Sequence, residues 1–293
     1  MTILQAIVLG LVQGLTEFIP VSSTAHLVFA ARVLNLYGGV DKTLQAEQTT
    51  ATIAVIQLGT LLAVFVYFAR DIAKILRAFT SDHLALMKGR SVPGQPKLSQ
   101  DAWLGWLVII GSIPIGTVGL LLKKQIEGPF TKNLWVIATM MIVVGLLLAI
   151  AEAVGKRDHD MSQLRIRDAL AVGFAQVVSL IPGSSRSGST MMGGLFSGLT
   201  RETAARFSFL LSIPAISASG LLELREAIHK LPDGSYGALI VATIVSGAVG
   251  YASIWFLLRF LRTHSTGVFI VYRVIVGGLI LAALAAGYVS ASI

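Results

Sequence analysis

Long apolar stretches separated by short polar segments dominate the sequence. Six of these stretches are about 20 residues long, the length of an α-helix that crosses the hydrocarbon core of a bilayer. We predict membrane-spanning helices at 50–69, 102–122, 133–153, 203–225, 236–257 and 267–290. The pattern therefore predicts an all-α, polytopic membrane protein.

Two further apolar segments, 3–31 and 168–198, are interrupted in the middle by proline, serine and a charged residue. The interruptions contain Pro20 and Pro182, and proline disfavours a continuous helix because it lacks an amide donor and clashes with the preceding turn. Non-helical backbone at membrane depth persists only where protein or a water-filled cavity covers it. We therefore predict two re-entrant helical hairpins, each of which enters and leaves the membrane on one side.

The two halves of the chain resemble each other. Residues 18–23 align with residues 180–185, and both segments contain a Pro-x-Ser-Ser string. The chain is then one membrane domain, 1–293, whose halves 1–153 and 154–293 each contain one hairpin and three spans. Because three crossings are an odd number, the second half is inverted relative to the first. In this inverted-repeat plan, broken helices meet near the midplane and form the site.

The composition supports the membrane assignment. The chain has 55% hydrophobic residues, 13% charged residues and a mean hydropathy of +0.78, whereas a soluble domain carries roughly 25% charged residues. The net charge of +8 suggests nucleic acid at first sight. Basic residues in membrane proteins mostly flank helices and set orientation, so we expect no nucleic-acid partner. The chain has no cysteine, which excludes disulfide and thiolate chemistry.

Lysine and arginine are unevenly shared between the two predicted faces of the membrane. Fourteen of the 23 basic residues lie in the loops of one face, which are 70–101, 154–167, 199–206 and 258–266. The loops of the other face contain seven: 32–49, 123–132 and 225–235. The positive-inside rule places the first face in the cytoplasm and both termini outside. The first hairpin then enters from outside and the second from the cytoplasm, so that their tips can meet.

Two charged residues lie inside the predicted hairpins, Glu17 in the first and Arg186 in the second. A charge at the centre of a membrane helix costs about 2.5–3.5 kcal/mol on insertion scales, so such residues are usually functional. A buried ion pair that only fixes the packing is the simpler alternative. The hydroxyl, amide and imidazole side chains around both residues argue against it and indicate one polar site built from both tips.

This predicted site has the chemistry of an anion site. Ser22 and Ser184 precede new helices, and helix N-termini present free amide donors and partial positive charge. Arg186 can hold phosphate oxygens with a bidentate fork. We therefore expect phosphate or pyrophosphate to bind, with these side chains as ligands: Gln13, Ser22, Thr24, Ser184, Ser185, Ser187 and Thr190.

The same site is compatible with two classes of function. Ser23 and His26 are three residues apart on the second arm of the first hairpin, near Glu17, as a nucleophile and a base would be in an enzyme. A transporter of anions or lipid phosphates is the main alternative, because inverted repeats with broken helices are transporter architecture. A transporter has less use for the Ser23–His26 pair, and two buried charges disfavour a purely structural role.

Segments 13–26 and 182–190 resemble the two signature motifs of the undecaprenyl-pyrophosphate phosphatase family, the bacitracin-resistance type. These motifs are Glu/Gln-x-x-x-Glu and Pro-Gly-x-Ser-Arg-Ser-x-x-Thr, and the resemblance covers essentially the whole chain. It implies removal of the terminal phosphate from a C55 polyprenyl diphosphate on the periplasmic side of the bacterial inner membrane. It also implies a divalent cation, Mg²⁺ or Ca²⁺. Gln13 leaves Glu17 as the one carboxylate of the first motif and the expected metal ligand.

The resemblance and the residues together suggest a mechanism. Ser23 attacks the terminal phosphorus while Glu17 or His26 takes its proton. Arg186 and the hairpin amides stabilise the charge that spreads over the equatorial oxygens. His26, Ser185 or a water molecule are the alternative nucleophiles.

Arg273, early in the last predicted span, either reaches this site or extends to the membrane interface. The expected partners are the polyprenyl diphosphate lipid and the bilayer. A homodimer is compatible with the sequence.

Overall fold

The computed structural model describes residues 1–89, 98–122, 125, 133–228, 231 and 236–291. Over these residues the chain is helical and contains no β-strand, so the predicted all-α class is confirmed. In chain order the elements are α1 (Ile3–Phe18), α2 (Ser23–Val33), α3 (Lys42–Tyr67), α4 (Ala69–Met87), α5 (Gln100–Leu121), α7 (Leu134–Val154), the 3₁₀ helix η2 (Met161–Gln163), α8 (Ile166–Val178), α9 (Arg186–Phe196), α10 (Arg201–Ile228), α11 (Tyr236–Phe260) and α12 (Gly267–Ala285).

Five helices, α3, α5, α7, α11 and α12, are long and apolar enough to cross a membrane. They coincide with five of the six predicted spans, and they make the chain a multi-pass membrane protein. The sixth predicted span, 203–225, lies within α10, which is helical over 28 residues but is not among these five. Residues 203–225 contain four serines, three charged residues and Pro214, which together lower the hydropathy of this span.

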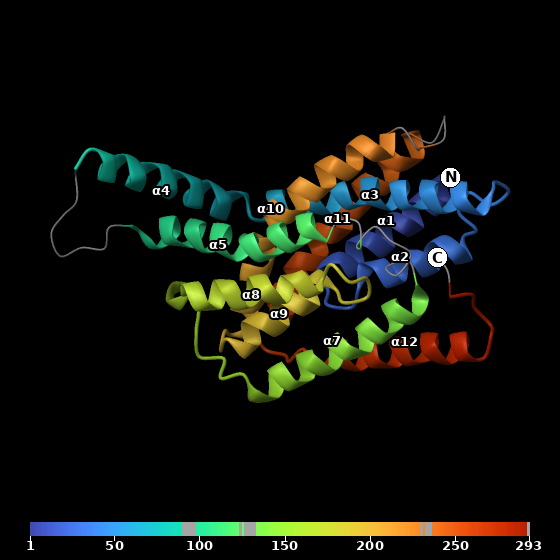
Figure 1. Ribbon diagram of the computed structural model, residues 1–293. Helices are drawn as coiled ribbons and strands as arrows, with labels where there is room; N and C mark the ends of the chain where they lie inside the picture. The colour runs from blue at the N-terminus through green and yellow to red at the C-terminus, as the bar shows by residue number, and fades with distance from the viewer. Residues whose placement is uncertain (90–97, 123–124, 126–132, 229–230, 232–235, 292–293) are drawn as a thin grey trace.

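Both predicted interruptions are present. Four residues separate α1 from α2, and seven separate α8 from α9. The first pair folds back on itself, because the Gln5 amide near the start of α1 donates to the Leu34 carbonyl at the end of α2, at 2.9 Å. The second pair does the same, since Gly193 of α9 lies directly against Ala175 of α8. Figure 1 shows the first pair on the right and the second on the left, with their turns meeting between them.

Small residues hold α1 deep between α3 and α11. A Cβ atom at Gly10 would lie 2.5 Å from the Ala242 carbonyl, and one at Gly14 would lie 2.7 Å from Cβ of Val249. Such close helix approach is typical of membrane bundles. It buries the polar residues at the C-terminal end of α1.

Residues 70–101 differ from the loop that their polar composition predicts. Residues 69–87 form helix α4, which packs along α5 through Ile75 and Phe79 against Gly105. No residue of α4 is buried, so no continuous apolar run marks this helix in the sequence. Residues 90–97 of the predicted linker, which include Pro93 and Pro96, lie outside the described residues.

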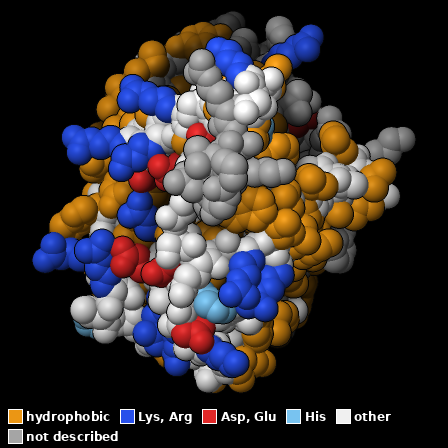
Figure 2. Space-filling view, turned by 90° about the vertical axis from the view of Figure 1, so that its left-hand side faces the viewer, with side chains coloured by type: hydrophobic (Ala, Val, Ile, Leu, Met, Phe, Trp, Pro, Cys, Tyr) orange, Lys and Arg blue, Asp and Glu red, His pale blue; other side chains and the backbone are white. Residues whose placement is uncertain are grey.

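The connections between helices gather at the two ends of the bundle. At the left of Figure 1 lie the connections α3–α4, α7–α8, α9–α10 and α11–α12, and at the right lie both termini and the α2–α3 connection. These groups correspond to the two sets of loops predicted from the sequence, although most of 123–132 and 229–235 lies outside the described part. Figure 2 looks onto the left end, where many Lys and Arg side chains gather.

Candidate functional site

The two hairpin turns enclose a small polar cavity of about 60 Å³. Glu17, Ser22, Ser23 and Thr24 line it from the first turn. From the second turn it is lined by residues that include Ser185 and Arg186. The structure therefore brings both motifs together at one polar site.

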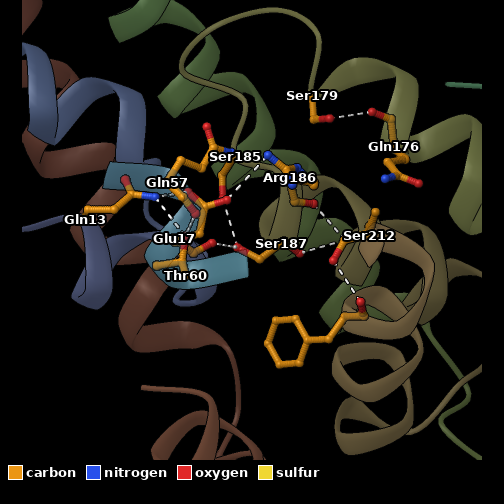
Figure 3. Close-up of polar contacts among 12 residues, drawn as sticks. Gln13, Glu17, Gln57, Thr60, Gln176, Ser179, Ser185, Arg186, Ser187 and Ser212 are labelled. Carbon is orange, nitrogen blue, oxygen red and sulfur yellow. Dashed lines mark hydrogen bonds and ion pairs between the residues drawn. The ribbon is translucent and has the colours of Figure 1, made fainter. Parts of the chain in front are cut away.

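Glu17 and Arg186 form an ion pair across the two turns (Figure 3). Nη2 of Arg186 lies 3.4 Å from Oε1 of Glu17, and Nε2 of Gln13 donates to Oε2 of Glu17 at 3.0 Å. The same Gln13 nitrogen donates to the Thr60 hydroxyl at 3.2 Å, and that hydroxyl donates to the Gln57 carbonyl at 2.7 Å. Helix α3 thus orients the amide of Gln13, and this amide orients the carboxylate of Glu17.

Arg186 retains a donor for a ligand. Its side chain is 23% exposed and lines the cavity, yet its buried Nη1 has no hydrogen-bond partner among the described residues. A buried donor without a partner costs roughly 1–3 kcal/mol. A phosphate oxygen would satisfy it once the guanidinium turned this donor toward the cavity.

Two helix N-termini face the same cavity. Ser22 precedes α2 with a φ of 78°, and Ser185 precedes α9 with a φ of 67°, a left-handed conformation that is uncommon for serine. The Ser22 side chain makes no capping hydrogen bond, so it leaves the first amides of α2 free of a side-chain cap. Free amides at a helix N-terminus favour an anion.

The predicted phosphate ligands divide into two groups. Ser22, Thr24 and Ser185 line the cavity. The others lie behind it and bond to protein: Gln13 to Glu17, Ser184 to the Ile181 carbonyl at 2.6 Å, Ser187 to the Glu17 carbonyl at 3.5 Å, and Thr190 to the Arg186 carbonyl at 2.7 Å and to Ser208. These four side chains support the cavity wall from behind. The spacing of residues along the sequence could not distinguish them from the side chains that line the cavity.

His26 lies differently from the prediction that it sits beside Ser23. Its Nδ1 is 2.6 Å from the Ser22 carbonyl and its Nε2 is 2.6 Å from the Tyr272 hydroxyl. Ser23 lines the polar cavity, whereas His26 lines an apolar groove next to it. Residues three apart on a helix differ by about 60° in direction, so the two side chains fall on either side of the first turn of α2.

This apolar groove, about 340 Å³ in volume, runs between α1, α2 and α12. Its wall is almost entirely apolar and includes Val12, Phe29, Val276, Leu279 and Ala283. The first turn of α2 contributes Ser23 and Thr24 to the cavity and Ala25 and His26 to the groove. The polar cavity and the apolar groove therefore adjoin, which suits a ligand with an anionic head and a hydrocarbon tail.

Arg273 is the residue whose role the sequence leaves open. It is fully buried, so the prediction that it could extend to the interface is wrong. Its guanidinium donates to five carbonyls, those of Met140 and Met141 in α7, Pro20 in the first turn, and Gly183 and Ser184 in the second. Arg273 thus ties the two turns to each other and to α7. Thr60 and Tyr272 also contribute to the site without having been predicted.

The residues do not form a prebuilt metal site. In the described part of the chain, no group of three His, Cys, Asp or Glu side chains could hold a metal ion. Both oxygens of Glu17 are already engaged, one by Arg186 and one by Gln13. Divalent cations prefer several oxygen ligands, and the described residues that line the cavity include one carboxylate, Glu17.

The helices and the site define a multi-pass membrane protein with a polar cavity next to an apolar groove. The family model of the bacitracin resistance protein BacA matches residues 6–279. The chain belongs to this family.

Close relatives carry one name. The chain is 51% identical to the undecaprenyl-diphosphatase of Syntrophobacter fumaroxidans, over 96% of this chain and 97% of that protein. It is 45% identical to the undecaprenyl-diphosphatase of Mycolicibacterium gilvum, over 99% of this chain and 100% of that protein. It is 47% identical to the undecaprenyl-diphosphatase of Synechococcus elongatus, over 97% of this chain and 93% of that protein.

Proposed function

We propose that this protein is an undecaprenyl-diphosphatase, an integral membrane enzyme that removes the terminal phosphate of undecaprenyl diphosphate. The product, undecaprenyl phosphate, is a lipid carrier for cell-wall synthesis. The observation that carries the proposal is the junction of the polar cavity and the apolar groove at the first turn of α2. The diphosphate would enter the cavity while the polyprenyl chain stays in the groove and in lipid.

Ser23 is the proposed nucleophile because it lines the cavity. In this mechanism its Oγ bonds to the terminal phosphorus while the bond from that phosphorus to the bridging oxygen breaks. The lipid monophosphate leaves and a phosphoserine remains, which water then hydrolyses to inorganic phosphate. Glu17, the titratable group that shares the cavity with Ser23, is the proposed proton acceptor, in preference to His26.

Positive charge and amide donors stabilise the transferring phosphoryl group in this proposal. Arg186, which lines the cavity, directs its guanidinium to an equatorial oxygen, and the N-termini of α2 and α9 supply amides. His26 lies between the cavity and the groove, where the lipid-linked phosphate would sit. A divalent cation, Mg²⁺ or Ca²⁺, would arrive as a complex with the diphosphate, since the described residues form no prebuilt site for it.

We further propose that the fold is an inverted repeat of six spans and two re-entrant hairpins. The two broken pairs approach from opposite ends in Figure 1. Both termini lie at the same end, which supports an even number of crossings with α10 as the sixth span despite its lower hydropathy. The basic end would face the cytoplasm, and the first hairpin would open to the outer side.

Phosphate release by the purified protein in detergent tests the function. Undecaprenyl diphosphate is supplied with Mg²⁺ or Ca²⁺ to the parent and to the Arg186→Ala, Glu17→Ala and Ser23→Ala variants. We expect release by the parent and at least about 100-fold less by the variants, because each removes a group that acts at the reacting phosphorus. Arg262→Ala is the matched control, since Arg262 is an exposed arginine paired with Glu202 at the basic end.

No release by the parent with either cation would contradict the enzyme assignment and leave a lipid-phosphate transporter as the explanation of the site. Release that persists in all three variants would place the reaction elsewhere. Loss in Arg186→Ala and Glu17→Ala but not in Ser23→Ala would make water or another side chain the nucleophile.

A further inference from the structure

Tyr272 of α12 is the polar neighbour of His26 that the proposed mechanism does not use. Its hydroxyl lies 2.6 Å from Nε2 of His26, and the two rings are stacked with centroids 5.6 Å apart and planes at 13°. The partners are 246 positions apart in the chain. The contact therefore joins the last helix to the first turn of α2, at the mouth of the apolar groove that both residues line.

The two hydrogen bonds of His26 determine which ring nitrogen carries the proton. Nδ1 faces the Ser22 carbonyl at 2.6 Å, and a carbonyl can only accept, so Nδ1 must be protonated. In the neutral ring Nε2 is then the basic nitrogen, and the Tyr272 hydroxyl must donate to it. The Ser22 carbonyl thus fixes the tautomer of the imidazole, and Tyr272 holds its Nε2 side.

We propose that Tyr272 is a positioning residue for His26: its hydroxyl holds Nε2 and so fixes the imidazole next to the junction of cavity and groove. This inference rests on the proposed function for its catalytic consequence. Without the hydroxyl, only the Ser22 carbonyl orients the ring, and Nε2 loses its partner. The stacked phenyl ring alone does not distinguish one ring nitrogen from the other.

Nitrogen NMR of the purified protein with ¹⁵N-labelled histidine tests the positioning directly. Among the five histidines, the resonance lost in His26→Gln identifies His26. We expect the free parent to show His26 with Nδ1 protonated and Nε2 unprotonated. In Tyr272→Phe, which keeps the aromatic ring, we expect Nδ1 to stay protonated and the Nε2 resonance to shift, because Nε2 loses its hydrogen bond to the hydroxyl.

Steady-state kinetics give the second readout. In Tyr272→Phe we expect kcat to fall about tenfold, as for loss of one hydrogen bond that orients a catalytic group. KM should stay within about twofold, because the apolar lining of the groove is unchanged. The matched control is Tyr251→Phe in α11, where the tyrosine ring contacts Tyr67 away from the site. This control should match the parent in both constants.

An unchanged Nε2 resonance of His26 together with an unchanged kcat in Tyr272→Phe would overturn the proposal. A rise in KM at constant kcat would also overturn it, since Tyr272 would then serve only to bind the lipid chain. If the parent releases no phosphate, the proposed function fails by itself, and the NMR comparison still decides whether Tyr272 positions His26.

Discussion

Arg273 shows how one side chain can determine the geometry of a site that it does not line. Its guanidinium donates five hydrogen bonds to carbonyls of both turns and of α7. In Arg273→Lys the charge remains, but an ammonium has three donors and cannot reach these carbonyls in one plane. We expect a loss of about 2–4 kcal/mol in the free energy of unfolding, since hydrogen bonds from charged groups contribute roughly 1.5–3 kcal/mol each.

The measurement is the midpoint of thermal unfolding in detergent, which should fall by at least about 5 °C. Arg259→Lys is the matched control, because Arg259 is an exposed arginine stacked on Trp255. Equal midpoints for the two variants would show that the carbonyl cluster does not depend on the guanidinium.

At the residue scale the sequence predicts the centre of the site better than its supports. Glu17 and Arg186 stand out because a charge within an apolar segment is costly, and the structure places them 3.4 Å apart. Thr60 and Tyr272 have no such signal, since a lone hydroxyl in a membrane helix is common. Their contribution depends on which helices pack together, and a single sequence does not contain that information.

At the scale of elements, the turn between α8 and α9 depends on one glycine. Gly183 has a φ of 92°, and a Cβ atom there would lie 2.1 Å from the Ile137 carbonyl. Both the conformation and the space exclude a side chain, and a strained residue of this kind costs roughly 1–3 kcal/mol before the clash is counted. We expect Gly183→Ala to lower phosphate release to less than about a tenth of the parent, because the turn must move away from α7.

Gly278→Ala provides the comparison, since nothing lies within 4 Å of a Cβ atom at this position of α12. Within a helix this substitution is favourable by up to about 1 kcal/mol, so activity and thermal midpoint should be kept or raised. Normal activity in Gly183→Ala would show that the turn tolerates another conformation.

The groove between α2 and α12 supports a prediction about chain length. Ala283 lines it, and in Ala283→Phe the added ring would occupy space that the polyprenyl chain needs. We expect kcat/KM for undecaprenyl diphosphate to fall about tenfold, because binding energy from the remote chain is lost. A water-soluble C5 diphosphate should be hydrolysed within about twofold of the parent rate.

Ala282→Phe is the control, because Ala282 is exposed and does not line the groove. If Ala283→Phe slowed both substrates equally, the ring would have distorted the cavity. If it slowed neither, the chain would lie elsewhere.

Among the elements, the sequence predicts broken helices more reliably than amphipathic ones. Proline and serine within apolar runs locate both interruptions. Helix α4 has an apolar face too, through Ile72, Ile75 and Phe79, but half of its surface is polar and none of it is buried. The length of an apolar run therefore identifies spans. It does not identify a helix such as α4, of which only one face, with Ile72 and Ile75, packs against the core.

At the scale of the whole molecule, the distribution of charge and the position of the ends predict orientation. Ser81 in α4 belongs to the basic end, whereas Leu4 and Tyr288 belong to the end with both termini. All three are exposed, and the chain has no cysteine, so single-cysteine variants can be labelled cleanly. With a membrane-impermeant maleimide on intact spheroplasts, we expect Leu4→Cys and Tyr288→Cys to react and Ser81→Cys to react only after lysis.

Each pattern of labelling tests a different part of the architecture. Reaction of Ser81→Cys alone in intact spheroplasts would invert the orientation and put the opening of the first hairpin in the cytoplasm. Reaction of only one of Leu4→Cys and Tyr288→Cys would require an odd number of crossings. Helix α10 would then not span the membrane, and the inverted repeat, which needs three spans in each half, would fail with it. Protection after lysis would mean that the residue is covered in the membrane, and a neighbouring position would be needed to locate that end.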